Sequence, residues 1–265
     1  MMNKKKVGIV SAVLIGGLIG VSMFLRSIYV APVLMYHFID KNDKESKLVV
    51  TPESFKRQME FLKGNEYNVI SLDELADIIR SGKPVGPKTV CITFDDGSED
   101  NYLYAYPVLK ELDLPATIFV YVNAVGTPGY LTVGEMRQML SDSKVKIGSH
   151  TKAHYWLGKT EKGKGNPAKA REEVYGSKKA LEEMTGSPVT FFSYPGGGFT
   201  SQTRQMVLDA GYKGAVATNP GAKYPNNDIY ALKRSKITRT SNNLAVFWVE
   251  SSGYYIGMKK RQDND

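Results

Sequence analysis

Segments of two kinds alternate along most of this chain: short runs of β-prone apolar residues and longer segments with helical periodicity. Regular β-then-α order favours a mostly parallel sheet, because each helix returns the chain to the edge where the next parallel strand begins. The expected strands are 30–36, 67–70, 89–94, 116–122, 145–148, 190–193 and 214–217. This pattern by itself allows two α/β architectures, a closed barrel and an open doubly wound sheet.

The expected helices lie between these strands, at 52–62, 72–80, 102–111, 132–140, 168–184 and 201–210. No internal repeat or long linker interrupts the alternation. We therefore expect one domain over residues 30–258. Residues 259–265 are polar and are expected to form a tail.

The first 29 residues have a different character. Residues 4–6 are lysines, and residues 7–25 form an uncharged run that Arg26 closes. Nineteen residues at about 1.5 Å each give roughly 28 Å, close to the ~30 Å hydrocarbon core of a membrane. We expect residues 1–29 to form a cytoplasmic Lys cluster and an uncleaved signal anchor, with a transmembrane helix over 7–25. The protein would then cross the cell membrane once with its domain extracytoplasmic, or be secreted if the segment is cleaved.

The charge balance first suggests a nucleic-acid partner, because 35 Lys and Arg stand against 27 Asp and Glu, a net charge of +8. However, residues 4–6 and Arg26 supply four of these basic residues, and every acidic residue follows Arg26. The rest of the chain has 31 basic and 27 acidic residues, a net charge of +4. It has no Lys/Arg stripe interleaved with aromatic residues, so we expect no nucleic-acid partner. Cys91 is the single cysteine, which excludes an internal disulfide.

Two adjacent carboxylates follow the strongest expected strand, 89–94. They are Asp95 and Asp96, and Gly97 comes next. In parallel α/β folds, functional sites assemble where strands end. Two neighbouring carboxylates are costly to ionise together unless a cation or hydrogen bonds intervene. The pair therefore indicates a site, although an Asp-Asp-Gly turn that merely starts a loop also fits.

Two of the three histidines follow another expected strand, 145–148. His150 and His154 are four residues apart, a spacing that would place both imidazoles on one face of a helical turn. Two histidines and one carboxylate are a common zinc-binding set that leaves positions for water and substrate. The sequence therefore predicts a divalent metal cofactor, with Zn2+ expected first and Co2+ or Ni2+ as alternatives.

The segments Thr93-Phe94-Asp95-Asp96-Gly97 and Ser149-His150-Thr151-Lys152-Ala153-His154 resemble the first two motifs of the polysaccharide deacetylases of carbohydrate esterase family four. The resemblance covers roughly residues 30–240. It implies a distorted (β/α) barrel, here preceded by the expected transmembrane helix, and metal-dependent removal of N- or O-acetyl groups from sugars. Carried over by position, it implies that Asp95 is the general base. It also implies three metal ligands, namely Asp96, His150 and His154.

The third motif departs from the common form of the family. Where the family often has Arg-Pro-Pro-Tyr-Gly, residues 192–198 read Phe-Ser-Tyr-Pro-Gly-Gly-Gly, so the Arg that usually steadies the base is missing there. The resemblance implies substrate-binding residues in this segment: Tyr194, Pro195 and Gly196. A backbone N–H near it is expected to hold the oxyanion. Tyr194 could equally belong to the core, and the glycines could form either a loop close to a ligand or a flexible turn.

The late Leu-x-His motif of the family is also absent, since no histidine follows His154. The remaining histidine, His37, ends the first expected strand in Met-Tyr-His. This arrangement resembles the branch of the family that acts on poly-N-acetylglucosamine, in which such a segment supplies the general acid. His37 is therefore the candidate acid, with a packed strand-end histidine as the alternative. That branch also has an Arg before a late strand, which implies Arg234 as the partner of Asp95.

Together these features predict a metal-dependent N-deacetylase that acts on an N-acetylglucosamine polymer, namely peptidoglycan, poly-N-acetylglucosamine or chitin oligomers. The alternatives are an O-deacetylase of acetylated xylan and a catalytically silent protein that binds the cell wall. The catalytic domain is expected to be monomeric. Trp156, two residues beyond His154, could stack on a sugar ring or pack beneath the metal loop.

Overall fold

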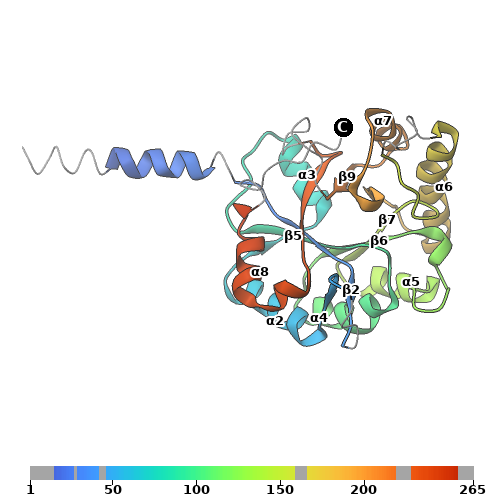
Figure 1. Ribbon diagram of the computed structural model, residues 1–265, viewed down its shortest axis with the longest axis horizontal. Helices are drawn as coiled ribbons and strands as arrows, with labels where there is room; N and C mark the ends of the chain where they lie inside the picture. Colours follow the sequence, from blue (N-terminus) through green and yellow to red (C-terminus); the bar gives the residue numbers. More distant parts are fainter. Residues whose placement is uncertain (1–14, 27–28, 42–45, 159–165, 219–227, 256–265) are drawn as a thin grey trace, which may run out of the picture.

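Eight strands form the main sheet of this computed structural model: β1 (Val33–Tyr36), β4 (Asn68–Val69), β5 (Thr89–Phe94), β6 (Ala116–Val120), β7 (Val145–Ser149), β8 (Phe191–Ser193), β9 (Gly214–Ala217) and β10 (Leu232–Lys236). Their order is β1-β10-β9-β8-β7-β6-β5-β4, and β1 also pairs with β5. All of these pairings are parallel. Seven strands therefore close into a barrel, and β4 adds to the start of β5 (Figure 1).

The structure describes residues 15–26, 29–41, 46–158, 166–218 and 228–255. Within these ranges the long helices are α2 (Pro52–Gly64), α3 (Leu72–Arg80), α4 (Tyr106–Glu111), α5 (Val133–Asp142), α6 (Pro167–Thr185), α7 (Ser201–Asp209) and α8 (Leu244–Ser251). Side chains at the N-caps of α2, α3, α5, α6 and α7 accept backbone N–H groups of the first turn, which satisfies donors that a helix start leaves free. The polar tail expected at 259–265 lies outside the described residues.

Burial explains why β5 is central. All six of its residues are buried, as expected of a parallel strand covered on both faces, and Cys91 is one of them. Its register with β1 pairs Tyr36 with Phe94. His37 and Asp95, the next residue of each strand, therefore leave the barrel at the same end. β7 and β8 are neighbours as well, so the segments that follow them open onto this same end.

Two segments differ from the expected pattern. Residues 101–105, expected to begin a helix, form a π-helical turn (Asn101–Ala105) that continues into α4. In addition, β2 (Phe38–Ile39) and β3 (Val49–Val50) form a separate two-stranded sheet. The π-helical turn contacts β2, directly beyond His37. π-helical turns of this kind often accompany functional sites.

The expectation of a transmembrane helix over residues 7–25 is wrong. Among the described residues, the helix in this region covers residues 15–26. No helix within the described ranges combines the length and the apolar character needed to cross a membrane. The expectation rested on the apolar character of the run alone, whereas a membrane span also requires a continuous helix of sufficient length. The Lys cluster and residues 7–14 lie outside the described residues.

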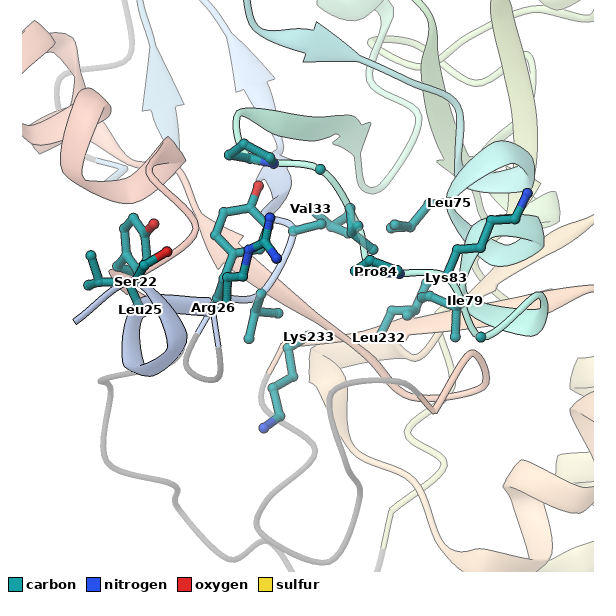
Figure 2. Close-up of a pocket in the computed structure, with 18 of the residues that line it drawn as sticks. Ser22, Leu25, Arg26, Val33, Leu75, Ile79, Lys83, Pro84, Leu232 and Lys233 are labelled. Carbon is teal, nitrogen blue, oxygen red and sulfur yellow. The ribbon is translucent and has the colours of Figure 1, made fainter. Parts of the chain in front are cut away.

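A cavity of about 680 Å3 lies between the helix of residues 15–26 and the opposite end of the barrel from His37 and Asp95 (Figure 2). Its lining includes Val33 and Leu232, the first residues of β1 and β10, and the loop of residues 82–87 before β5. None of the candidate site residues lines this cavity. The site must therefore be built from the residues at the carboxyl ends of the strands.

Candidate functional site

Three side chains bring potential metal-binding atoms together where β5 and β7 end. One atom each from Asp96, His150 and His154 lies within 4.8 Å of the others. Asp96 Oδ1 is 3.6 Å from His150 Nε2 and 3.5 Å from His154 Nε2. Two imidazole nitrogens and a carboxylate oxygen are a donor set that fits a divalent transition metal ion. These three residues could therefore hold a metal.

The backbone reaches this arrangement through left-handed conformations. Asp96, Thr151 and His154 have φ angles of 74°, 68° and 54°. Such angles are uncommon outside glycine and cluster at functional sites. Residues 151–153 form a turn, so the expected helical turn between the two histidines is wrong. The imidazoles still meet, with ring centroids 4.9 Å apart, because the strained backbone redirects His154 toward His150.

Gly97 completes the turn after β5. Its φ is 72°, and a Cβ placed on it would lie 3.0 Å from the side chain of Val120 at the end of β6. Both the conformation and the close packing require glycine here. The Asp-Asp-Gly segment therefore folds as a tight turn, and both of its carboxylates approach His150 Nε2, at 4.0 Å and 3.6 Å.

His150 is held in the tautomer that a metal ligand needs. Its Nδ1 lies 2.8 Å from the carbonyl oxygen of Ser193, and since a carbonyl can only accept, Nδ1 carries the hydrogen. The lone pair of His150 therefore lies on Nε2, the atom that approaches Asp96. Burial lowers the pKa of His150 to about 4, despite the opposing charge of Asp95, so this imidazole is neutral at pH 7.

Asp95, beside the metal-binding cluster, is paired with Arg234. Arg234 Nη1 donates to Asp95 Oδ1 at 2.7 Å, and Nη2 donates to Oδ2 at 2.6 Å. The structure thus places Arg234 in a bidentate ion pair with the residue expected to act as base. Burial alone disfavours the ionised form of Asp95, but the Arg234 guanidinium and the nearby His150 hold the pKa of this carboxyl well below its usual range.

Ser193 links the two halves of the site. Its hydroxyl donates to Asp95 Oδ1 at 3.2 Å and accepts from Arg234 Nη2 at 3.0 Å, while its carbonyl accepts from His150. Ser193 stands in the third motif, from which the Arg that is usual in the family is missing. The short side chain of Ser193 leaves space for the guanidinium of Arg234, which comes from β10.

The two adjacent carboxylates have opposite electrostatic environments. Burial, together with the negative charge of Asp95, raises the pKa of Asp96 to about 6. Asp95 stays ionised because of its ion pair with Arg234. A bound cation would favour the ionised form of Asp96. This opposition is the physical reason why the site fits a metal ion next to Asp96.

Glu173 of α6, which the sequence analysis missed, supports the loop between the histidines. This fully buried carboxylate accepts the backbone N–H groups of Lys152 and Ala153 through Oε2, both at 2.8 Å. Its Oε1 lies 3.2 Å from Lys169 Nζ. A sequence signal existed, because Glu173 falls on the buried stripe of α6 beside Ala170, Val174 and Ser177. An acidic side chain on the buried face of a helix is expected to have a specific hydrogen-bond or ion-pair partner.

His37 follows β1 directly, at the same end of the barrel. The side chain of Asn101, in the π-helical turn, donates to the His37 carbonyl at 2.9 Å. His37 Nδ1 is buried and has no hydrogen-bond partner among the residues that the structure describes. Burial lowers the pKa of His37 to about 4, although the charge of Asp95 acts in the opposite direction.

The expected substrate-binding residues of the third motif separate in the structure. Tyr194 is fully buried, its ring stacks on Phe199 with centroids 4.5 Å apart, and its hydroxyl donates to the carbonyl of Tyr230. Its side chain therefore belongs to the core. Pro195 is buried as well, whereas Gly196 is exposed. Of these three residues, only Gly196 presents its surface to solvent.

Comparisons with known proteins agree with this geometry. The family model of the polysaccharide deacetylases matches residues 82–215. YxkH of Bacillus subtilis (strain 168), whose name provisionally assigns it to the polysaccharide deacetylases, is 34% identical over 207 residues, which cover 78% of this chain and 71% of YxkH. The poly-beta-1,6-N-acetyl-D-glucosamine N-deacetylase of Staphylococcus aureus (strain MRSA252) is 25% identical over 210 residues, 76% of this chain and 72% of that protein.

A solved structure shows the same fold. The Streptococcus pyogenes deacetylase PplD, in complex with acetate, superposes with a TM-score of 0.72 at 28% identity, covering 82% of this chain and 98% of PplD. The resemblance that the two motifs indicated is thus confirmed by the match of the family model to half of the chain and by the identity to YxkH. This chain therefore belongs to the polysaccharide deacetylase family, whose members are hydrolases of acetylated polysaccharides.

Proposed function

We propose that this protein is a metal-dependent N-deacetylase of an N-acetylglucosamine polymer. One observation carries the proposal: the ionised Asp95 lies beside the donor cluster of Asp96, His150 and His154, with its Oδ2 4.0 Å from His150 Nε2. The similarity to a poly-N-acetylglucosamine deacetylase supports this substrate class. Poly-N-acetylglucosamine, peptidoglycan and chitin oligomers are the candidate polymers.

The donor cluster suits Zn2+, which binds two imidazoles and a carboxylate and keeps further positions open; Co2+ and Ni2+ also accept such a set. A bound ion would supply Lewis acidity at the acetyl carbonyl and for the attacking water. His150 presents Nε2 in the correct tautomer, and the raised pKa of Asp96 marks a carboxylate that a cation would favour. His154 is the exposed member, with a side chain 46% exposed, so its side of the cluster would face the substrate.

Asp95 would take a proton from the attacking water. A general base must be ionised before the reaction, and the ion pair with Arg234 ensures this. The same ion pair makes Asp95 a weak base in the free protein. Arg234 is therefore a positioning residue that fixes both the orientation and the basicity of Asp95.

His37 would donate a proton to the leaving nitrogen as the C–N bond breaks. Because its pKa is lowered to about 4, His37 is neutral at pH 7 in the free protein. It must therefore gain its proton during the reaction, and the proton that Asp95 takes from water is the available one. The products are acetate and a free amine on the sugar.

Gly196 is the proposed donor to the oxyanion. In the turn after β8, the N–H groups of Tyr194, Gly197 and Gly198 donate to the carbonyls of Val216, Tyr194 and Pro195. Gly196 is the exposed residue of this turn, and its φ of 61° suits glycine. A backbone N–H at this position costs no reorganisation when charge develops on the carbonyl oxygen.

We also propose that the domain works outside the cytoplasm and as a monomer. The lysines at 4–6 ahead of an apolar run are typical of export segments. All of the residues assigned a role here come from one chain, so a single copy has a complete site.

The test uses the full chain. Bound metal is quantified, and acetate release is measured from N-acetylglucosamine oligomers, peptidoglycan and acetylated xylan. Asp95→Asn is expected to retain metal and lose turnover, whereas His150→Ala is expected to lose both. Full activity of Asp95→Asn would contradict the mechanism. Faster acetate release from xylan than from the other substrates would favour the O-deacetylase, and wall binding without any acetate release would favour the silent binding protein.

A further inference from the structure

Trp156 lies against three glycines next to the metal-binding cluster. It follows His154 by two residues. A Cβ built on Gly198 would lie 2.1 Å from the indole ring, and on Gly158 and Gly196 it would lie 2.7 Å and 2.8 Å from it. These separations are far below the contact distance of two carbon atoms. Any larger residue at these positions would displace the indole.

The glycine run of the third motif is therefore a packing surface and not a flexible turn. Gly196 and Gly198 face the indole, while Gly197 faces Thr218. A Cβ built on Gly197 would lie 2.7 Å from the Cβ of Thr218. The alternation follows from the turn, in which neighbouring residues point to different sides. Close packing therefore requires glycine at each of these three positions.

The backbone next to Trp156 is also fixed. Leu157 forms a parallel bridge with Phe199, and its carbonyl accepts from Thr203 Oγ1 at 3.2 Å. Leu157 itself is 2% exposed and belongs to the core. The indole is therefore held both by its own packing and by the buried residue that follows it.

Despite this packing, Trp156 remains 45% exposed. This excludes the interpretation that it packs beneath the metal loop. An indole held in this way leaves a flat aromatic face open to a ligand, and aromatic side chains are frequent in the walls of binding pockets. If Gly196 is the oxyanion donor, its contact with Trp156 would bring this surface close to the acetyl group.

We propose that Trp156 is a stacking platform for one pyranose ring of the polymer, in a unit adjacent to the one that loses its acetyl group. The C–H groups on one face of a pyranose form an apolar surface that matches a flat aromatic ring, and pockets for such ligands combine aromatic walls with a few polar groups. The proposal rests on the proposed function, because it takes the substrate to be a sugar polymer. It predicts that binding improves when a second sugar is present.

The chain allows a direct spectroscopic test, since Trp156 and Trp248 are its only tryptophans. Trp248 lies on α8 and is 55% exposed, so Trp248→Phe leaves Trp156 as the single tryptophan reporter. Metal is removed with a chelator to prevent turnover, and the full chain is titrated with N-acetylglucosamine and its oligomers of two to six units. A saturable change in Trp156 emission, with tighter binding of oligomers than of the monomer, is expected. No change in emission with any oligomer would overturn the proposal.

Kinetics on the metal-loaded protein give a second readout. Trp156→Ala is expected to lose about tenfold in kcat/KM on oligomers, mainly through KM, and to lose most of the advantage that oligomers have over the monomer. Trp156→Phe, which keeps an aromatic face, is expected to retain most of the advantage of oligomers over the monomer. Gly198→Ala should act like Trp156→Ala because the new Cβ displaces the indole. Gly64→Ala, at a position with no atoms within 4 Å of a Cβ, is the control.

Two outcomes separate this proposal from the proposed function. If the wild type releases acetate from oligomers while Trp156→Ala keeps the wild-type dependence on chain length, the platform is overturned and the deacetylase stands. If no N-acetylated substrate releases acetate but oligomers still change Trp156 emission, the deacetylase fails and the sugar-binding site stands. Equal bound metal in Trp156→Ala and wild type excludes an indirect effect through His154.

Discussion

Arg234 of β10 holds Asp95, which follows β5, in a bidentate ion pair whose two hydrogen bonds measure 2.7 Å and 2.6 Å. Both side chains are buried, with 0% and 5% of their surface exposed. The two residues are 139 positions apart in the sequence. The ion pair determines the charge of the proposed base and also contributes to the stability of the barrel.

Removing this guanidinium is expected to destabilise the protein at neutral pH. Arg234→Met leaves Asp95 buried without its cation, which typically costs about 3–5 kcal/mol of unfolding free energy. Asp95 has a folded-state pKa below its unfolded one, so its contribution to stability is present above the unfolded pKa and is lost as pH falls through the folded pKa. The difference in Tm between wild type and Arg234→Met should therefore be large at pH 7 and begin to shrink only below the unfolded pKa of about 3.9.

Arg204→Met provides the comparison for this experiment. Arg204 also forms a bidentate pair, with Asp228 at 3.1 Å and 2.7 Å, but its side chain is 25% exposed. Its removal is expected to cost less, because solvent can stabilise the remaining carboxylate. Equal losses of stability in the two variants at pH 7 would contradict the role of burial at Asp95.

Asp96→Asn is expected to stabilise the metal-free protein at neutral pH while abolishing metal binding. The folded state raises the pKa of Asp96 from 3.8 to about 6, so its favourable contribution holds below pH 3.8 and is lost as pH rises through 6. This difference corresponds to about 3 kcal/mol at most. Thermal unfolding of chelator-treated wild type and Asp96→Asn at pH 4 and pH 8 measures this difference in stability. The variant should be more stable than the wild type only at pH 8.

Asp113→Asn is the matched control, because Asp113 also has a left-handed backbone, with φ 57°. Its carboxylate is exposed and pairs with Lys144 at the surface. A similar gain of stability in Asp113→Asn would mean that asparagine merely suits the left-handed conformation. The buried charge of Asp96 would then not be the cause.

Glu173→Gln is expected to loosen the loop between the histidines and to weaken metal binding about tenfold. The carboxylate accepts two backbone N–H groups at once, and an amide side chain replaces one acceptor oxygen with a donor group. Hydrogen exchange in the metal-free protein should show faster exchange at Lys152 and Ala153 than in the wild type. Glu172→Gln, one residue away on α6 and 51% exposed, should leave the exchange at both backbone amides unchanged.

Tyr194→Phe is expected to lower stability by about 1 kcal/mol and to leave KM unchanged. The substitution removes the hydrogen bond from the Tyr194 hydroxyl to the Tyr230 carbonyl, which lies within the core. Denaturant unfolding and steady-state kinetics on the same preparation separate the two effects. A rise in KM at unchanged stability would instead indicate that the Tyr194 hydroxyl contacts the substrate.

Local sequence patterns predicted much of the fold. The helix α3 and the strand β5 occupy the expected residues, 72–80 and 89–94, because hydrophobic periodicity and N-caps act over a few neighbouring residues. No helix was expected at residues 244–251, where the structure forms α8. The expected transmembrane helix was wrong, since no helix among the described residues is long and apolar enough to cross a membrane.

The sequence by itself determined the candidate site residues Asp95, Asp96, His150 and His154, because they lie in short segments directly after strands. Only the tertiary structure decided how they are supported. Arg234, Glu173 and Ser193 reach the site from three different elements, and closure of the barrel brings those elements together. Trp156 acquires its exposed, fixed position in the same way, through glycines some 40 residues further along the chain. Contacts between distant segments depend on the packing of the whole barrel, which no local pattern encodes.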